Sequence, residues 1–177
     1  GSKENYKKKI KRELKKNINF DYIEKKNSPT ILKKRFIEEV DNNKLLGIYS
    51  INDDQLDQNE QDLFLKKYNK HDKNSNLTII NDYGHGLFNE KIINEISKKK
   101  NFLAINAQVN SFNLGYHNIS KYKKADLMLM NETEARHELR VKSSDRSELI
   151  KKLSKKIKSK FITITHGKNG ASIYSTK

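Results

Sequence analysis

The sequence contains no cysteine, a single proline and no long apolar run. The absence of cysteine excludes disulfides and thiolate-bound metal sites. No apolar segment approaches the roughly 18 residues that a membrane-spanning helix needs, so a membrane is not an expected partner. Gly1 and Ser2 are followed by charged residues and not by the apolar core of a secretory signal. The expected location is therefore cytoplasmic.

Several common catalytic and nucleotide-binding motifs are also missing. The chain has no Gly-x-x-x-x-Gly-Lys-Ser/Thr loop, no Gly-x-Gly-x-x-Gly fingerprint and no Gly-x-Ser-x-Gly elbow. These absences argue against P-loop, dinucleotide-binding and serine-hydrolase sites. The five histidines show no metal-ligand spacing with one another: His71, His85, His117, His137 and His166.

The composition is strongly basic, with a net charge of +15 and a pI near 9.7. Such a charge can indicate a nucleic-acid-binding domain, which stays open as an alternative. Here, however, the cations are mostly Lys and are spread over helical patterns, which is typical of solvated helix faces. Nucleic acid is therefore not the expected partner. Apolar residues make up 34% of the 177 residues and are clustered, so they can form a modest core.

The first third of the chain is predicted to form a helix and a small β segment. Residues 3–17 carry Tyr6, Ile10 and Leu14 at a spacing of four, which predicts an amphipathic helix. Residues 19–50 are predicted to form a β-meander or hairpin, because strand-like runs alternate with turn signals. The runs cover residues 20–23, 30–37 and 45–50, and the turns cover 27–29 and 41–43.

Residues 76–177 are predicted to form an α/β core, which follows a helix at 58–69. The predicted strands are apolar without alternation, which favours a mostly parallel sheet with helices on both faces. The whole chain is therefore predicted to be one domain of the α/β class. The expected strands lie at 77–82, 102–106, 126–130, 161–165 and from 171, and the expected helices lie at 89–99, from 131 and at 146–158.

Three predicted strands end in turns that carry Asp, Asn, Glu or Gly. Open α/β sheets bind ligands at the carboxyl ends of their strands. Glycine also permits positive φ and close approach of a ligand to the backbone. The pattern therefore predicts a nucleotide or sugar site. The three turns are Asp82-Tyr83-Gly84-His85-Gly86, Asn131-Glu132-Thr133-Glu134 and Thr165-His166-Gly167-Lys168-Asn169-Gly170.

Each of these turns also has a purely structural interpretation. Asp82 could orient a hydroxyl or a hydrated magnesium ion, or it could cap the helix at 89–99. Asn131 and Glu134 match a capping box, although amide and carboxylate groups can also hold magnesium waters and nucleotide phosphates. The third turn could approach a nucleotide or form a tight hairpin. Lys33-Lys34-Arg35 could clamp a sugar phosphate or form an exposed strand face.

In their order along the chain, these segments resemble the ribokinase-like (PfkB) family of carbohydrate kinases. The nearest branch is D-glycero-D-manno-heptose-7-phosphate kinase, which is usually joined to a nucleotidyltransferase domain. Residues 28–37 resemble the Pro-Thr-x-x-Lys-x-Arg lid strand, and residues 82–86 resemble the Asp-Tyr-Gly-x-Gly turn. The remaining matches are Asn131 and Glu134 in an Asn-x-x-Glu motif, and Thr165 and Gly167 at the start of the nucleotide-binding turn.

The resemblance implies a partial ribokinase-like sheet with flanking helices and a small β lid at 19–50. It also implies phosphoryl transfer from ATP to a hydroxyl of a sugar or sugar phosphate, with ATP and Mg²⁺ as cofactors. The implied roles place Asn131 and Glu134 at the magnesium–phosphate end, Glu134 through water, and Thr165 and Gly167 beside the nucleotide. Asp82, Gly84 and Gly86 would line the cleft, and Lys33 and Arg35 would hold the phosphate of the acceptor.

The sequence departs from the family at three places. The Gly-Ala-Gly-Asp motif that supplies the catalytic base and the Gly-Gly sugar-binding motif do not occur in it. An internal fragment without a catalytic residue, inactive alone, is therefore expected. Residues 106–110 replace an Asp-Pro-Lys type of strand end, which favours a separate subgroup with a different sugar. The alternative from another class is a binding module that forms a homodimer through the edges of the β lid.

Overall fold

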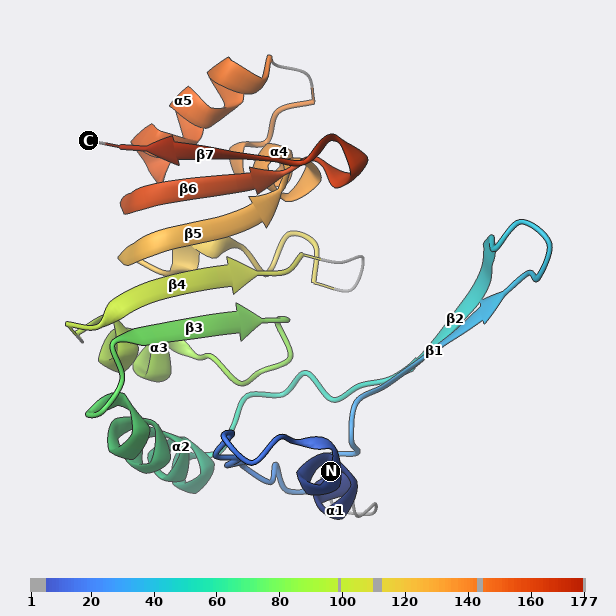
Figure 1. The fold of residues 1–177 in the computed structure, drawn as a ribbon, viewed down its shortest axis with the longest axis vertical. Coiled ribbons are helices and arrows are strands. Elements are labelled where there is room, and N and C mark those ends of the chain that lie inside the picture. Colours follow the sequence, from blue (N-terminus) through green and yellow to red (C-terminus); the bar gives the residue numbers. More distant parts are fainter. Residues whose placement is uncertain (1–5, 99, 110–112, 143–144, 177) are drawn as a thin grey trace.

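The computed structural model describes residues 6–98, 100–109, 113–142 and 145–176, and its main feature is a five-stranded sheet (Figure 1). The strand order is β3-β4-β5-β6-β7, with the first four strands parallel and the last antiparallel. The predicted α/β class with a mostly parallel sheet is confirmed. The strands are β3 (Leu77–Asp82), β4 (Phe102–Ala107), β5 (Ala125–Asn131), β6 (Ser159–Thr165) and β7 (Ala171–Ser175).

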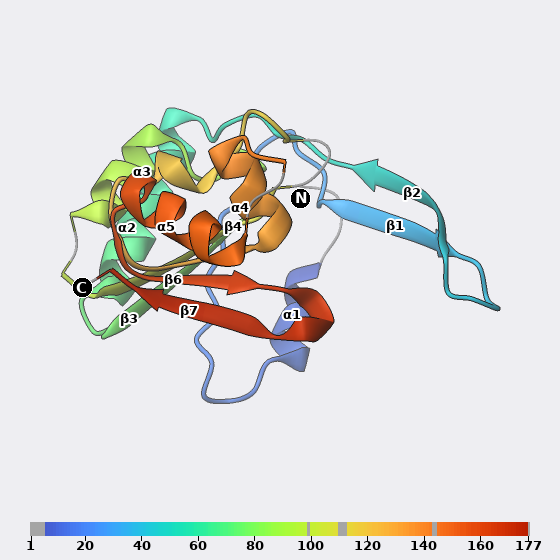
Figure 2. The same cartoon turned by 90° about the horizontal axis from the view of Figure 1, so that it is seen from above.

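The core lies between one face of this sheet and the helices α3 (Glu90–Ser97), α4 (Glu132–Leu139) and α5 (Arg146–Lys156) (Figure 2). Every second strand residue points into this core, as the two-residue period of a strand requires. On the other face, Leu77, Ile79 and Ile173 are largely exposed. The prediction that helices cover both faces is therefore wrong for β3 and β7. The strand side chains buried against the helices include Ile80, Ile105, Met128, Met130, Ile162 and Ile164.

The helices begin at polar residues that accept hydrogen bonds from the first backbone N–H groups. Asn89 caps α3, and Asp145 caps α5. Helix α2 (Gln58–Asp72) begins with a capping box in which Asp57 and Glu60 exchange side-chain-to-backbone hydrogen bonds. Among the described residues, every helix is too short or too polar to cross a membrane.

A two-stranded antiparallel hairpin of β1 (Leu32–Ile37) and β2 (Lys44–Ser50) projects away from the sheet (Figure 1). The predicted lid is thus a hairpin and not a meander, because residues 20–23 form no strand. The carboxylate of Asp21 and the carbonyl of Tyr22 both accept hydrogen bonds from Lys67 of α2, at 2.5 and 2.8 Å. A third strand was predicted at residues 20–23, but these contacts attach the segment to α2 instead.

The N-terminal helix is shorter than predicted. Helix α1 covers Tyr6–Glu13, whereas residues 3–17 were expected to be helical. Residues 3–5 lie outside the described residues, and residues 14–17 continue without helical structure. None of the residues of α1 is buried. The apolar stripe of this helix therefore contributes little to the core.

Candidate functional site

The predicted site residues lie along one edge of the sheet. In the parallel ladders, Asp82 at the end of β3 is opposite Ala107, and Asn131 at the end of β5 is opposite Thr165 of β6. All these strand ends therefore share the carboxyl edge, where open α/β sheets bind ligands. Two separate pockets open along this edge, one beside β3 and one between β5 and β6.

The β3 pocket has a volume of about 340 Å³ and contains the first predicted turn. Asp82 is only 2% exposed. Its carboxylate lies 2.5 Å from the ammonium of Lys121 and accepts hydrogen bonds from the Tyr122 hydroxyl at 2.7 Å and the Gly84 amide at 2.9 Å. The interpretation of Asp82 as a helix cap is wrong, because Asn89 occupies that position. Asp82 instead anchors the segment before β5 to the end of β3.

The electrostatics of this pocket follow from burial and from the Asp82–Lys121 pair. Burial alone would raise the pKa of Asp82, but the contacts with Lys121 and Tyr122 outweigh it, and the net effect lowers that pKa. Burial raises the pKa of the Tyr122 hydroxyl, and the neighbouring Asp82 carboxylate raises it further. Burial also lowers the pKa of His117, which favours a neutral imidazole. The pocket floor thus consists of a compensated ion pair and uncharged polar groups.

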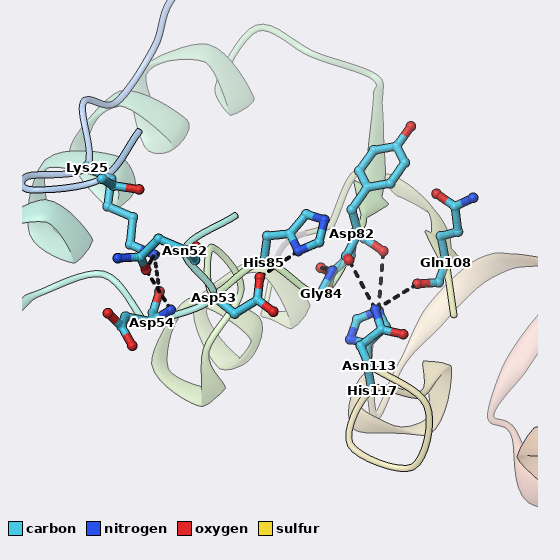
Figure 3. A network of polar contacts seen from close by, with 12 residues as sticks. Lys25, Asn52, Asp53, Asp54, Asp82, Gly84, His85, Gln108, Asn113 and His117 are labelled. Atoms are coloured by element: carbon cyan, nitrogen blue, oxygen red, sulfur yellow. Dashed lines mark hydrogen bonds and ion pairs between the residues drawn. The ribbon is translucent and has the colours of Figure 1, made fainter. Parts of the chain in front are cut away.

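Residues 113–121, which precede β5, line the other side of the β3 pocket, and Figure 3 shows Asn113 and His117 beside Asp82. The amide of Asn113 donates hydrogen bonds to the carbonyls of Tyr83 and Gln108, at 3.1 and 3.2 Å. A ring nitrogen of His117 lies 3.2 Å from the carbonyl of Asp82. The predicted positive φ is present at Gly84, where a Cβ atom would lie only 2.5 Å from the Asn113 amide nitrogen. The positive φ and this contact with the Asn113 side chain both favour glycine at position 84.

The β5–β6 pocket has a volume of about 370 Å³ and brings together three predicted residues, Asn131, Thr165 and Gly167. Gly167 has a φ of +59°. Glu132 lies in the same pocket and accepts hydrogen bonds from Arg136 at 2.6 Å and Arg146 at 3.2 Å. The pocket therefore combines amide, hydroxyl and guanidinium groups, which are suitable donors for phosphate oxygens.

A histidine completes the polar network around Glu132. The Nδ1 atom of His166 lies 2.9 Å from the Glu132 carboxylate, and its Nε2 atom lies 3.0 Å from the Ser172 hydroxyl of β7. Hydrogen bonds from Arg136 and His166 lower the pKa of Glu132 to about 2. Glu132 is thus ionised at neutral pH, and its negative charge is balanced by the two nearby arginines.

Glu134 points away from the β5–β6 pocket. Asn131 and Glu134 form the predicted capping box, with hydrogen bonds of 2.8 Å in both directions. The other carboxylate oxygen of Glu134 accepts a hydrogen bond from the Val109 amide at 3.0 Å. The side chain lines a smaller cavity of about 100 Å³ beside His137 and Glu138. The capping interpretation is confirmed, whereas the role of Glu134 toward magnesium stays a prediction.

The two predicted cations of the hairpin have different surroundings. The ammonium of Lys33 lies 5.9 Å from the ring centroid of Tyr83, so Lys33 reaches the turn after β3. Arg35 is two residues further out on β1 and interacts with Tyr49 of β2. Lys33 therefore borders the β3 pocket region, and Arg35 contacts the opposing strand of the hairpin.

The sequence matches the family model of pfkB family carbohydrate kinases over residues 3–177. The chain belongs to this family. The bifunctional protein HldE of Campylobacter concisus is 31% identical over 102 residues, which are 56% of this chain and 21% of that protein. The chain thus spans about a fifth of the length of this curated relative.

Two solved kinase structures share the fold of the chain. Ribokinase from Giardia lamblia aligns with a TM-score of 0.61 at 16% identity, over 85% of this chain and 47% of that one. Phosphofructokinase-2 from Escherichia coli aligns with a TM-score of 0.56 at 10% identity, over 76% and 43%. The chain therefore spans less than half of either neighbour, and these likenesses show the fold alone.

Proposed function

We propose that this chain supplies the nucleotide site and part of the sugar site of an ATP-dependent kinase for a sugar or sugar phosphate. The observation that carries the proposal is the common edge of the sheet, on which the β3 pocket and the β5–β6 pocket both open. A kinase needs two adjacent sites of this kind, because the phosphoryl group passes directly between donor and acceptor. Membership of the pfkB family supports the same assignment.

The β5–β6 pocket is the proposed site of the ATP phosphates. The Thr165 hydroxyl, the Asn131 amide and the backbone around Gly167 line it, and Arg136 adds a guanidinium. This donor set fits phosphate oxygens. Magnesium would neutralise charge on the phosphates. Because Glu134 faces the neighbouring cavity and not this pocket, we do not assign it to the metal. Among the described residues, no group of three or more His, Asp or Glu side chains could hold a metal directly.

The β3 pocket is the proposed site of the sugar. Asp82, Gly84 and Gly86 line it, and Lys33 and Arg35 would hold the phosphate of a phosphorylated sugar. Asp82 is a poor candidate for the catalytic base, since its low pKa and its pairing with Lys121 disfavour proton uptake. No Gly-x-Gly-Asp segment occurs among the 177 residues. We therefore propose that these residues alone do not transfer phosphate, and sugar-dependent ADP release by the chain would refute this.

Magnesium-ATP is expected to stabilise the chain, and Thr165→Val is expected to weaken this effect. At ten times the dissociation constant, binding adds about 1.4 kcal/mol, which raises the Tm of a chain of this size by about 3–6 °C. Valine keeps the shape of threonine but removes the hydroxyl, so ATP affinity should fall by about three- to tenfold. Differential scanning fluorimetry over a range of ATP concentrations measures both effects.

Thr78→Val is the matched control for this measurement, since Thr78 lies near the amino end of β3, away from the pocket edge. Each variant is compared with its own Tm without ATP, which removes any effect of the substitution on stability. An unchanged Tm of the wild-type chain with magnesium-ATP would contradict the nucleotide site. An equal response of Thr165→Val and wild type would remove Thr165 from it.

We also propose that the hairpin pairs with a second copy of the chain. One face of the hairpin carries four exposed apolar residues around Lys34, whereas Lys33 and Arg35 lie on the opposite face, where Lys33 reaches Tyr83. Exposed apolar surface of this kind is typical of an interface. The four apolar residues are Leu32, Phe36, Leu46 and Ile48.

Leu46→Lys is expected to convert such a dimer to a monomer, because it places a charge beside Phe36 on the apolar face. Sedimentation velocity over a range of protein concentrations measures the change. Lys33→Ala alters the opposite face of the hairpin and should leave the dimer intact. A wild-type chain that stays monomeric at all concentrations would refute the proposed pairing.

A further inference from the structure

The segment that leads from the hairpin back to the core runs across the turn after β3 (Figure 3). We call residues 52–56 the hairpin stem. The Leu56 amide donates a hydrogen bond to the Gly86 carbonyl at 3.4 Å. A Cβ atom on Gly86 would lie only 1.9 Å from the carbonyl oxygen of Asp54. The backbone of the stem is therefore in direct contact with the turn.

A lysine holds the start of the stem in a compact shape. The ammonium of Lys25 donates hydrogen bonds to the side-chain oxygen of Asn52 at 2.8 Å and to its carbonyl at 3.1 Å, and also contacts the carbonyl of Asp54. The same side-chain oxygen of Asn52 accepts a hydrogen bond from the Asp54 amide at 2.9 Å. Asp53 thus lies between Asn52 and Asp54, whose positions these hydrogen bonds fix.

One side-chain contact joins the stem to the turn from this position. The Nδ1 atom of His85 lies 2.8 Å from the Asp53 carboxylate (Figure 3). The His85 side chain is only 8% exposed, whereas that of Asp53 is 44% exposed. Asp53 and Gln55 of the stem line the β3 pocket, opposite Asn113 and His117. The stem therefore forms one wall of this pocket, and the buried His85 contacts that wall through the Asp53 carboxylate.

The other ring nitrogen of His85 adds no second contact. Nε2 is buried and has no hydrogen-bond partner among the described residues. The carboxylate of Asp53 can only accept, so Nδ1 carries the hydrogen. His85 thus contributes a single hydrogen bond, and that bond points to the stem.

We propose that His85 is a positioning residue of the β3 pocket, which fixes Asp53 and with it the hairpin stem as one wall. The proposal rests on the proposed function only in treating this pocket as the sugar site. Because the stem continues directly into β2, the contact also sets where the hairpin leaves the core. Loss of the contact should loosen the stem while the sheet itself stays folded.

Amide hydrogen exchange of the 177-residue chain, followed by NMR, tests this. His85→Ala should raise the exchange rates of the stem amides by about tenfold, since a hydrogen bond to a charged group is lost. His85→Asn keeps an N–H donor near the position of Nδ1 and should restore rates to within about threefold of wild type. Nitrogen-15 shifts of the wild-type imidazole should show a hydrogen on Nδ1.

His71→Ala is the matched control, since His71 lies 3.4 Å from Asp21 in a similar pair that does not involve the stem. It should leave the exchange of the stem unchanged. If His85→Ala unfolds the chain, Asp53→Asn provides a second test. It weakens the same hydrogen bond from the exposed partner and should raise the exchange rates of the stem amides by about threefold. The amides of β5 and β6 report global unfolding in each variant.

If the stem amides of His85→Ala exchange at the same rates as in the wild type, the proposal is overturned. Equal rates in His85→Ala and His85→Asn would also overturn it, since they would mean that only the bulk of the ring matters. None of these outcomes requires ATP or sugar. A chain that shows the expected exchange but no response to magnesium-ATP would retain the role of His85 and refute the proposed kinase site.

Discussion

Gly86→Ala is expected to lower the free energy of unfolding by about 3–5 kcal/mol, from backbone strain and steric overlap together. Gly86 has a φ of +79°, a conformation that alanine adopts only with strain. In addition, the new Cβ atom would lie 1.9 Å from the carbonyl oxygen of Asp54 and 2.8 Å from that of Asp53. Both obstacles are backbone atoms, so a side-chain rotation cannot relieve the overlap. Urea denaturation measures the loss.

Gly115→Ala separates the two causes. Gly115 also has a positive φ, at +88°, but a Cβ atom there would meet nothing within 4 Å. Only the backbone strain applies, and the expected loss is about 1–2 kcal/mol. Equal losses in the two variants would show that the close packing of the stem on the turn contributes nothing to stability.

Lys121→Met is expected to cost about 3–5 kcal/mol, since it leaves a buried carboxylate without its counter-charge. Asp82 is 2% exposed, and its carboxylate lies 2.5 Å from Lys121. Lys91→Met is the matched control, because Lys91 pairs with Asp62 at the surface. Its expected cost is below about 1 kcal/mol. Chemical denaturation at pH 7 measures both.

The pH dependence of this loss follows from the lowered pKa of Asp82. A carboxylate whose pKa is lower in the folded state stabilises the protein above its unfolded pKa of about 4, and this stabilisation is lost as the pH falls through the folded pKa. The difference between wild type and Lys121→Met should therefore shrink as the pH falls below about 4 and through the lowered folded pKa of Asp82, where its carboxylate becomes protonated. Adding Asp82→Asn to Lys121→Met should recover part of the loss at pH 7. A difference that does not change with pH would contradict the ion-pair explanation.

The elements that depend on local sequence could be predicted closely. The strand at Leu77–Asp82 has the predicted bounds, since an apolar run between polar turns specifies a buried strand without further context. The capping box of Asn131 and Glu134 follows from residue types three positions apart. By contrast, the apolar alternation at residues 20–23 predicted a strand that is absent, because contacts with Lys67 of α2 replace strand pairing.

The partners of the site residues could not be predicted, because they come from elements distant in sequence. Lys121 and Tyr122 reach Asp82 from the segment before β5, and Arg146 reaches Glu132 from α5. In the sequence, the one indication of the partners of Asp82 was the polar loop after β4, which lies at the same edge of the sheet as the predicted turns. Glycine at position 84 was expected to make room for a ligand, whereas the structure shows that Asn113 fills that space.

The strand order of the sheet bears on how the chain can assemble during synthesis. Each strand from β4 to β7 lies beside the one that precedes it in the sequence. A newly made strand therefore finds its partner among residues already synthesised, and the chain between them is short enough to close at low entropic cost. The sheet can grow in one direction as the ribosome releases it. The pocket beside β3 would be enclosed before the pocket between β5 and β6 exists, so the two pockets form in sequence.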